Sequence, residues 1–255
     1  MLPVATERIL SNLPEDATVL DVGAWAAPLN RATHVLDLMP YETRGAMGSY
    51  GPGPERFSAD TWTVRDICAR EPWPYDDDTF DFAICVTTLE DIRDPIWVCA
   101  ELSRVAKAGY VEVPTPEAEL IYNVEGDGPW LGHDHHRWIV DIVENELVFT
   151  HKLHSIHHDW TVRVLPRWRE TMGLEDHLHG LFWEGELPAR ERILIGVTDY
   201  TEFRDELRDR IRTRFHPSER ELKLKHAREE AKRRLGLARA PLRKAAERLL
   251  SRGRP

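Results

Sequence analysis

The sequence predicts an α/β protein with a mostly parallel sheet, antiparallel hairpins after its fifth strand and a charged, helical C-terminal tail. Short apolar runs rich in Val, Ile and aromatic residues recur five times within about 95 positions, which is typical of buried strands. Helical patterns separate these runs, as in the βαβ units that build parallel sheets. The chain contains no repeat of fixed period, and its 255 residues suffice for one main domain with an appendage.

Five segments are predicted to form the parallel strands: Thr18–Val22, His34–Leu38, Thr61–Val64, Phe80–Val86 and Gly109–Val113. A crossover helix is expected between the last two. Asp94-Pro95 opens it, because proline suits the first turn of a helix, where its missing N–H costs nothing. Apolar residues then recur at helical spacing as far as Val105.

The other segments are predicted from turn residues and charge. Two antiparallel pairs are expected after the fifth strand, one around Glu144-Asn145 and one around Pro188-Ala189. Met47–Ser58 concentrates Gly, Pro and Ser, so a mobile loop is expected there. Residues 1–200 are expected to form the main domain and residues 201–255 a charged helical extension.

Composition argues against several classes of protein. The net charge of -10 disfavours nucleic acid as the main partner, because phosphate binding needs clustered Lys and Arg. No apolar run approaches the ~20 residues that cross a bilayer, and no basic region followed by an apolar stretch opens the chain. The three cysteines show no paired spacing, which argues against a disulfide framework. We therefore expect a cytoplasmic protein.

The C-terminal tail differs from the acidic body. Residues 218–255 carry thirteen Lys or Arg against five Glu. Leucines recur among these charges at Leu222, Leu224, Leu235, Leu237, Leu242, Leu249 and Leu250. Such a helix could dock on the acidic body, on a partner or on an anionic membrane surface, and the sequence does not choose among them.

One long stretch is specific enough to suggest a family: WPYDDDTFDFAICVTTLEDIRDPIWVCAELSRVAKAGYVEVPTP. It resembles the acidic turn, fourth strand, helix, basic turn and fifth strand of the class I S-adenosylmethionine-dependent methyltransferases, in particular the type-11 methyltransferase-domain group. The resemblance covers about 100 of the 255 residues, from Thr18 to Pro114. It implies a Rossmann-like sheet, S-adenosylmethionine as cofactor, and O-methylation of a small molecule or glycan precursor.

The resemblance also implies a cofactor site at the strand ends. Its glycine-rich turn corresponds to Asp21-Val22-Gly23-Ala24-Trp25-Ala26-Ala27-Pro28, where Trp25 and Ala27 replace two glycines. The tryptophan could pack over the cofactor or fill its space. The segment from this turn to Asp37 is short, and Pro28 and Asn30 make it more turn than helix.

Two further acids are implied to hold the cofactor. The carboxylate of Asp37 is suited to accept hydrogen bonds from both ribose hydroxyls, and the alternative is a solvated acid at a strand end. Asp66 is implied to contact the adenine amine with Ile67 on the ring, and the alternative is a helix cap. The complete set expected to bind the cofactor is Asp21, Gly23, Trp25, Asp37, Leu38, Asp66, Ile67, Val86 and Thr87.

Nine of the twelve histidines lie between His133 and His179. Methyl transfer to oxygen needs a deprotonated acceptor, and histidine is suited to take that proton. His135 or His136 is therefore expected to be the base, with Arg137 orienting an anionic or carbonyl group of the substrate. Glu90 and Asp91 occupy the family's positions for a Glu-His pair and are interpreted as structural residues at a helix start.

Other interpretations of this region stay open. His154 and His158 are four residues apart and could bind a metal with His133 and Asp134, but no recognised ligand motif is present and no metal is expected. Five tryptophans suit core packing or a substrate pocket: Trp130, Trp138, Trp160, Trp168 and Trp183. The alternatives to a methyltransferase are a binding protein that kept the fold without turnover and a metal-dependent enzyme that uses the histidines.

Overall fold

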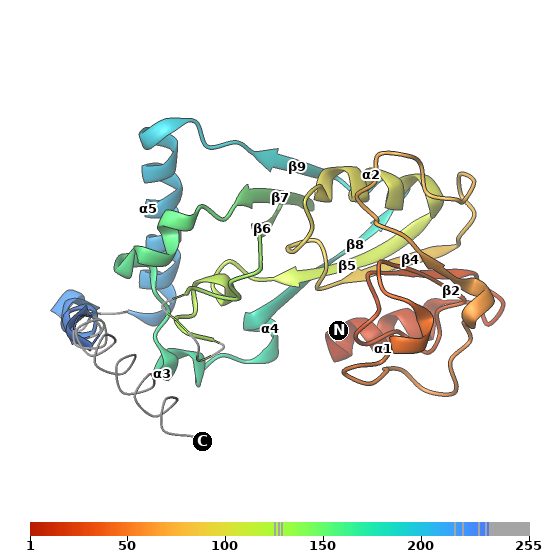
Figure 1. Ribbon diagram of the computed structural model, residues 1–255, viewed down its shortest axis with the longest axis horizontal. Helices are drawn as coiled ribbons and strands as arrows, with labels where there is room; N and C mark the ends of the chain where they lie inside the picture. Colours follow the sequence, from red (N-terminus) through yellow and green to blue (C-terminus); the bar gives the residue numbers. More distant parts are fainter. Residues whose placement is uncertain are drawn as a thin grey trace, which may run out of the picture.

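The computed structural model describes residues 1–124, 126, 128, 130–216, 218–220, 222–228, 230–232 and 234 (Figure 1). Helix α1 (Pro3–Asn12) precedes a six-stranded sheet, and a smaller sheet with several short helices follows in the chain. The second half ends in the long helix α5 (Gly196–Phe215), at the opposite end of the molecule from α1 in Figure 1. None of the described helices is long and apolar enough to cross a membrane.

The main sheet has the strand order β3-β2-β1-β4-β5-β8. Its strands are β1 (Val19–Val22), β2 (His34–Asp37), β3 (Trp62–Val64), β4 (Phe82–Val86), β5 (Ala108–Pro114) and β8 (Leu178–Glu184). The first five are parallel and β8 pairs antiparallel with β5. All five predicted strands are thus confirmed, as is the α/β class with a parallel sheet. The order 3-2-1-4-5 is that of Rossmann-like sheets.

Both faces of this sheet are covered, which explains why its strands are apolar at successive positions. Leu20 and Leu36 face helix α2 (Pro95–Val105), and Val19 and Val35 face α1. Helix α2 is the predicted crossover between β4 and β5, and its first turn is capped by the Asp94 carboxylate, which accepts a hydrogen bond from the Trp97 N–H.

The other three connections between the parallel strands contain no α-helix in the described chain, only the 3₁₀ turns η1 (Tyr41–Thr43) and η2 (Ala59–Thr61). The turn-like character predicted between Asp21 and Asp37 is therefore confirmed. Met47–Ser58 forms a loop, as expected, without any helix or strand.

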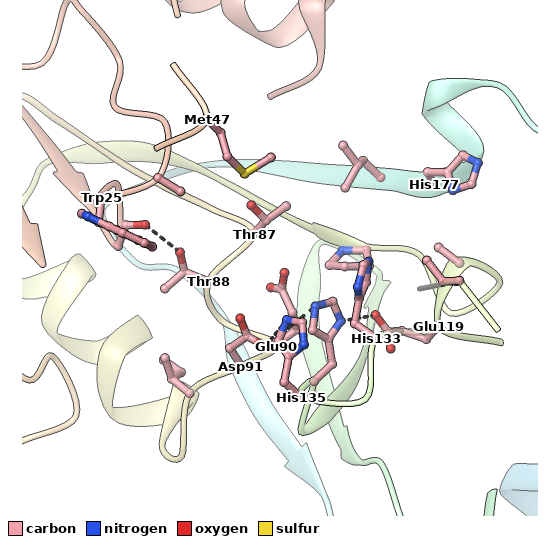
Figure 2. A pocket seen from close by; sticks show the side chains of 18 of the residues that line it. Trp25, Met47, Thr87, Thr88, Glu90, Asp91, Glu119, His133, His135 and His177 are labelled. Atoms are coloured by element: carbon pink, nitrogen blue, oxygen red, sulfur yellow. Dashed lines mark hydrogen bonds and ion pairs between the residues drawn. The ribbon is translucent and has the colours of Figure 1, made fainter. Parts of the chain in front are cut away.

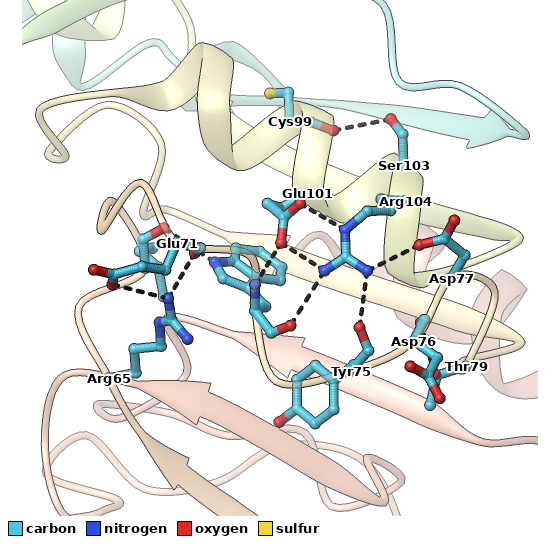
Figure 3. A network of polar contacts seen from close by, with 12 residues as sticks. Arg65, Glu71, Tyr75, Asp76, Asp77, Thr79, Cys99, Glu101, Ser103 and Arg104 are labelled. Atoms are coloured by element: carbon cyan, nitrogen blue, oxygen red, sulfur yellow. Dashed lines mark hydrogen bonds and ion pairs between the residues drawn. The ribbon is translucent and has the colours of Figure 1, made fainter.

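Side chains hold the helix-free connection between β3 and β4 on helix α2 (Figure 3). The Arg104 guanidinium donates to the Glu101 carboxylate at 2.7 Å and to the backbone carbonyls of Trp73 and Tyr75 at 3.2 and 2.8 Å. Glu101 in turn accepts from the Trp73 N–H at 2.6 Å. These bonds satisfy backbone groups that a helix would otherwise pair internally.

The smaller sheet has the order β6-β7-β9, with strands β6 (Trp138–Val143), β7 (Glu146–His151) and β9 (Ala189–Arg192). The hairpin predicted around Glu144-Asn145 is confirmed, and both residues have positive φ, 52° and 64°, as a tight two-residue turn requires. The second predicted hairpin is wrong. Strand β8 joins the main sheet beside β5, and β9 pairs in parallel with β7.

Short helices and turns make up much of the second half of the chain: η3 (Ala118–Leu120), η4 (His154–His158), η5 (Trp160–Val162), α3 (Pro166–Arg169) and α4 (Leu174–His177). Helix α5 buries Phe203, Leu207 and Ile211 against them. In the tail Leu222 is buried and Leu224 is exposed. The other tail leucines, from Leu235 onward, lie outside the described residues.

Candidate functional site

A cavity of about 740 Å³ lies at the carboxyl ends of the parallel strands (Figure 2). Loops after β1, β2, β3 and β4 form one end of it, and the segment before β6 with η3 and α4 forms the other. Trp25 and His177 mark opposite ends in Figure 2. In open α/β sheets this edge is where ligands bind, so the cavity is the candidate functional site.

Gly23 forms the tight turn after β1. Its φ of +73° is in the left-handed region, and a Cβ there would lie 2.4 Å from the side chain of Thr88. The Gly23 N–H donates to the Leu36 carbonyl at 2.9 Å, which ties the turn to β2. Glycine is required at this position by backbone conformation and by contact with Thr88.

Trp25 and Asp37 are joined at the wall of the cavity. The Asp37 carboxylate accepts the Trp25 N–H through Oδ2 at 2.9 Å and the Met39 N–H through Oδ1 at 2.7 Å. Burial raises the pKa of Asp37 while these hydrogen bonds act to lower it. The Trp25 indole N–H donates to the Thr43 carbonyl at 2.8 Å, so the ring is held at the wall, and it leaves the cavity open.

Asp66 also lines the cavity, in an ion pair with Arg93 at 2.7 Å and with the Cys68 N–H donating to its Oδ1 at 2.9 Å. Burial acts to raise the pKa of Asp66, but the contacts with Arg93 and the Cys68 N–H and the charge of Arg65 together outweigh it and leave the pKa lowered. No helix follows Asp66, so it is not a helix cap. Leu38 and Ile67 supply apolar wall nearby.

Three predicted site residues do not line the cavity. Asp21 is buried behind the turn, where its Oδ2 accepts the Leu29 N–H at 2.9 Å, and burial raises its pKa to about 8. Val86 packs into the core beneath the cavity. Arg137 is exposed, and its backbone N–H donates to the Glu90 carbonyl at 2.7 Å. The cofactor contacts expected of Asp21 and Val86 and the substrate contact expected of Arg137 stay predictions, whereas Thr87 does line the cavity.

Three histidines gather at the other end of the cavity. One ring nitrogen from each of His133, His135 and His136 lies within 4.8 Å of the others. Asp91 faces two of them, with its Oδ1 3.8 Å from His135 Nε2 and 3.7 Å from His136 Nε2. Figure 2 shows Asp91 and Glu90 on one side of the rings and Glu119 on the other.

A buried ion network fixes one of these rings. The Glu119 carboxylate contacts His136 Nδ1 at 2.5 Å through Oε1 and Lys152 Nζ at 2.6 Å through Oε2. Lys152 Nζ also donates to the His133 carbonyl at 2.9 Å. Burial acts to raise the pKa of Glu119, but His136 and Lys152 outweigh it and leave the pKa lowered. Glu119 therefore stays ionised and orients His136 with Nε2 toward Asp91.

Glu90 lines the same end and is 1% exposed. Its Oε2 has no hydrogen-bond partner among the described residues, and burial raises its pKa well above the ordinary value. A buried carboxyl group with an unsatisfied oxygen on a cavity wall is suited to bind a polar group of a ligand. Glu90 and Asp91, interpreted from the sequence as structural residues at a helix start, both line the cavity, and helix α2 begins only at Pro95.

The metal ligands considered from the sequence do not come together. His154 and His158 stack edge to face with ring centroids 5.5 Å apart in η4, and neither lines the cavity. Nearby, His157 accepts the Leu131 N–H at 3.0 Å, and burial lowers its pKa to about 4. None of the five tryptophans of the second half lines the cavity, and three are core residues: Trp138, Trp168 and Trp183.

Sequence analysis missed several residues of the site, which are far apart in the chain: Glu119, Lys152, Arg169 and His177. Glu119 and Lys152 belong to no sequence motif, and their separation of 33 residues does not indicate that they are in contact. The one available signal was a Lys and a Glu among apolar neighbours near the histidines. Arg169, from α3, lies on the cavity wall where Arg137 was expected.

Comparisons with known proteins give distant structural likeness only. No family model matches the chain, and no curated protein sequence matches it. Solved structures of S-adenosylmethionine-dependent methyltransferases resemble it: one from Mesorhizobium loti (16% identity, 45% of this chain, 55% of that chain, TM-score 0.31) and one from Aquifex aeolicus (21%, 44%, 64%, 0.30). The chain thus covers less than two thirds of either. Similarity at this level assigns no activity.

Proposed function

We propose that this protein is an S-adenosylmethionine-dependent methyltransferase that methylates a hydroxyl group of a small molecule or glycan precursor. The observation that carries the proposal is a single cavity with two chemically different ends. Acids and apolar residues from the strand ends line one end, as a nucleoside cofactor requires, and histidines line the other. A volume of about 740 Å³ is within the range of pockets that enclose a cofactor-sized ligand.

The residues at the strand ends fit the cofactor. Each Asp37 oxygen accepts one backbone N–H, and each retains a lone pair for a ribose hydroxyl. Leu38 and Ile67 offer apolar surface to an adenine ring, and Asp66 keeps acceptor capacity beside its ion pair with Arg93. When bound, S-adenosylmethionine would supply an electrophilic methyl group on its sulfonium.

The histidine end would receive the acceptor. The expectation that His135 or His136 takes the proton of the acceptor hydroxyl stays a prediction, and the Glu119 contact favours a His136 with Nε2 directed toward the cavity side. Arg169 would orient an anionic or carbonyl group, the role expected of Arg137. Positioning of the hydroxyl would supply most of the catalysis.

A binding protein without turnover is the second candidate, favoured by one observation. Trp25 and Met39 already occupy part of the acceptor capacity of Asp37, so the acid also serves as a structural residue of its own loop. In that case the cavity would bind a ligand but not transfer a methyl group.

Calorimetric titration with S-adenosylmethionine and with S-adenosylhomocysteine tests the proposal. Micromolar binding is expected for the native protein. Asp37→Ala should abolish it, and Leu38→Ala, whose side chain is 65% exposed and cannot disturb the core, should weaken it several-fold. The exposed acid Asp60 is the matched control, since Asp60→Ala should bind normally. Absence of binding to either compound would overturn the proposal.

A further inference from the structure

The histidine end has the composition of a metal centre. His133, His135 and His136 present nitrogen ligands, and Asp91 presents an oxygen that is buried and has no hydrogen-bond partner among the described residues. That oxygen faces the Nε2 atoms of His135 and His136 at 3.8 and 3.7 Å. Three histidine nitrogens thus lie within 4.8 Å of one another, and the Asp91 oxygen lies beside two of the three rings.

The distances are close to those of a bound ion. Metal bonds of ~2.0–2.2 Å around a tetrahedral ion place two ligands ~3.3–3.6 Å apart. The two separations from Asp91, 3.8 and 3.7 Å, are slightly longer than this. The histidine nitrogens lie within 4.8 Å of one another, so the widest pair must approach by about 1 Å. Rotation of the exposed His135 side chain can provide this.

Outer contacts orient the set in the way that metal sites require. A metal-bound histidine usually donates its second N–H to a carboxylate, which fixes the ring and raises its basicity. Glu119 contacts His136 Nδ1 at 2.5 Å and leaves Nε2 directed toward Asp91. Lys152, fully buried, balances the charge of Glu119 and holds the His133 carbonyl. Two further carboxyl groups lie beside the rings, Asp91 next to His135 and His136 and Asp134 next to His135, which favours a cation.

We infer that His133, His135, His136 and Asp91 bind a divalent first-row transition-metal ion of the zinc class. Imidazole ligands select such ions over Mg²⁺ and Ca²⁺, which prefer oxygen. Glu90, on the same wall with a free buried oxygen, could bind a water on the ion. This set differs from the one that the sequence suggested, which combined His154 and His158 with His133 and Asp134.

The role of the ion rests on the proposed function. An acceptor hydroxyl bound to the metal would lose its proton more easily, as metal-bound water does, and the proton would pass to water in the open cavity. His135 and His136 would then hold the ion rather than take the proton themselves. Metal binding itself does not depend on the cofactor, so the two proposals can fail separately.

Calorimetric titration with ZnCl₂ tests the inference on the full chain expressed without an affinity tag and freed of metal by chelation. The native protein is expected to bind one equivalent, and MgCl₂ none. Glu119→Gln should weaken zinc binding about 10–100-fold by releasing His136. His135→Ala removes a ligand and should weaken it further, without risk to folding, because the side chain is 57% exposed. Co²⁺ added in place of Zn²⁺ should give a visible absorption band that His135→Ala lacks.

The matched control is the double variant His154→Ala/His158→Ala, which alters two exposed histidines outside the cavity. It should bind zinc like the native protein. Less than a tenth of an equivalent bound by the native protein, or equal affinity in His135→Ala, would overturn the inference. Zinc binding without any binding of S-adenosylmethionine would leave the metal site in place and remove only its role in methyl transfer.

Discussion

The two ends of the cavity use acidic residues in opposite ways. At the strand ends, Asp37 and Asp66 are satisfied by backbone N–H groups and by Arg93. At the histidine end, Glu90 and Asp91 each keep a buried oxygen without a hydrogen-bond partner in the described part of the chain. Buried polar atoms are nearly always paired in folded proteins, so the exceptions require an explanation.

At the strand ends the acidic side chains hold the loops in place. At the histidine end two carboxylate oxygens are left for hydrogen bonds to a ligand. The strand-end loops after β1, β2 and β3 contain no α-helix, and their acids hold the backbone as well as any cofactor. At the histidine end, Glu119 contacts His136 and is itself paired with Lys152. Asp91 and the histidine rings line the cavity. Each prediction below alters one of these two arrangements.

The largest effect is expected for Lys152→Met. The substitution leaves the buried Glu119 carboxylate without its cation and should lower the free energy of unfolding by about 3–5 kcal/mol. Urea denaturation measures it. Adding Glu119→Gln to the variant should restore part of the loss, whereas Lys107→Met, which breaks an exposed pair with Asp81, should cost less than about 1 kcal/mol. A loss in Lys152→Met as small as in that control would contradict the network.

Gly23→Ala should destabilise the strand-end turn by about 2–4 kcal/mol, from left-handed strain and contact with Thr88. Gly53→Ala is the matched control, because Gly53 also has positive φ but open space around its missing Cβ, and should cost only about 1 kcal/mol. Thr88→Ala should rescue part of the Gly23→Ala loss in thermal unfolding. Equal losses in the two glycine variants would exclude the contact with Thr88.

Asp21 gives the strand-end region a dependence on pH. Its pKa, raised to about 8 by burial and by the charge of Asp37, means that the folded protein binds a proton that the unfolded chain has released above about pH 4. The contribution of Asp21 to stability must therefore fall as pH rises toward 8, by about 2 kcal/mol between pH 6 and 8. The charge of Asp21 helps to raise the pKa values of Tyr50 and Cys85, so both of these groups stay neutral between pH 6 and 8.

The substitution Asp21→Asn tests this dependence. The variant keeps an acceptor for the Leu29 N–H and cannot ionise, so its melting temperature should change less between pH 6 and 8 than that of the native protein. Asp81→Asn, which removes a carboxylate with a pKa of about 2, should retain the native slope. A native-like slope in Asp21→Asn would assign the dependence to another group.

The sequence predicts the main sheet well because its strands are buried on both faces. Segments such as Phe82–Val86 are apolar throughout, and this pattern is visible without a structure. The pairing of β8 with β5 could not be predicted in the same way. The local turn around Pro188-Ala189 suggests a hairpin, but β8 gains more by covering the free edge of β5 over seven residue pairs.

The site was predictable only where it follows from strand ends. Asp37 and Thr87 come directly at the ends of strands, so their approach to the cavity follows from the sheet. The histidine end depends on contacts between Glu119, His136 and Lys152, which lie on different elements. A residue count cannot say which of nine clustered histidines face inward, since that depends on how η3 and β7 pack.

The smallest effect is expected for Arg93→Ala, which asks whether Asp66 is a cofactor ligand. Arg93 and Asp66 are both about half exposed, so stability should change by less than about 1 kcal/mol. Removing the guanidinium frees Asp66 Oδ2 to accept a hydrogen bond, and affinity for S-adenosylmethionine should rise by a small factor in calorimetry. Asp66→Asn should weaken binding instead. A fall in affinity in Arg93→Ala would mean that the arginine positions Asp66 for the cofactor, and the pair would then act as one unit at this end of the cavity.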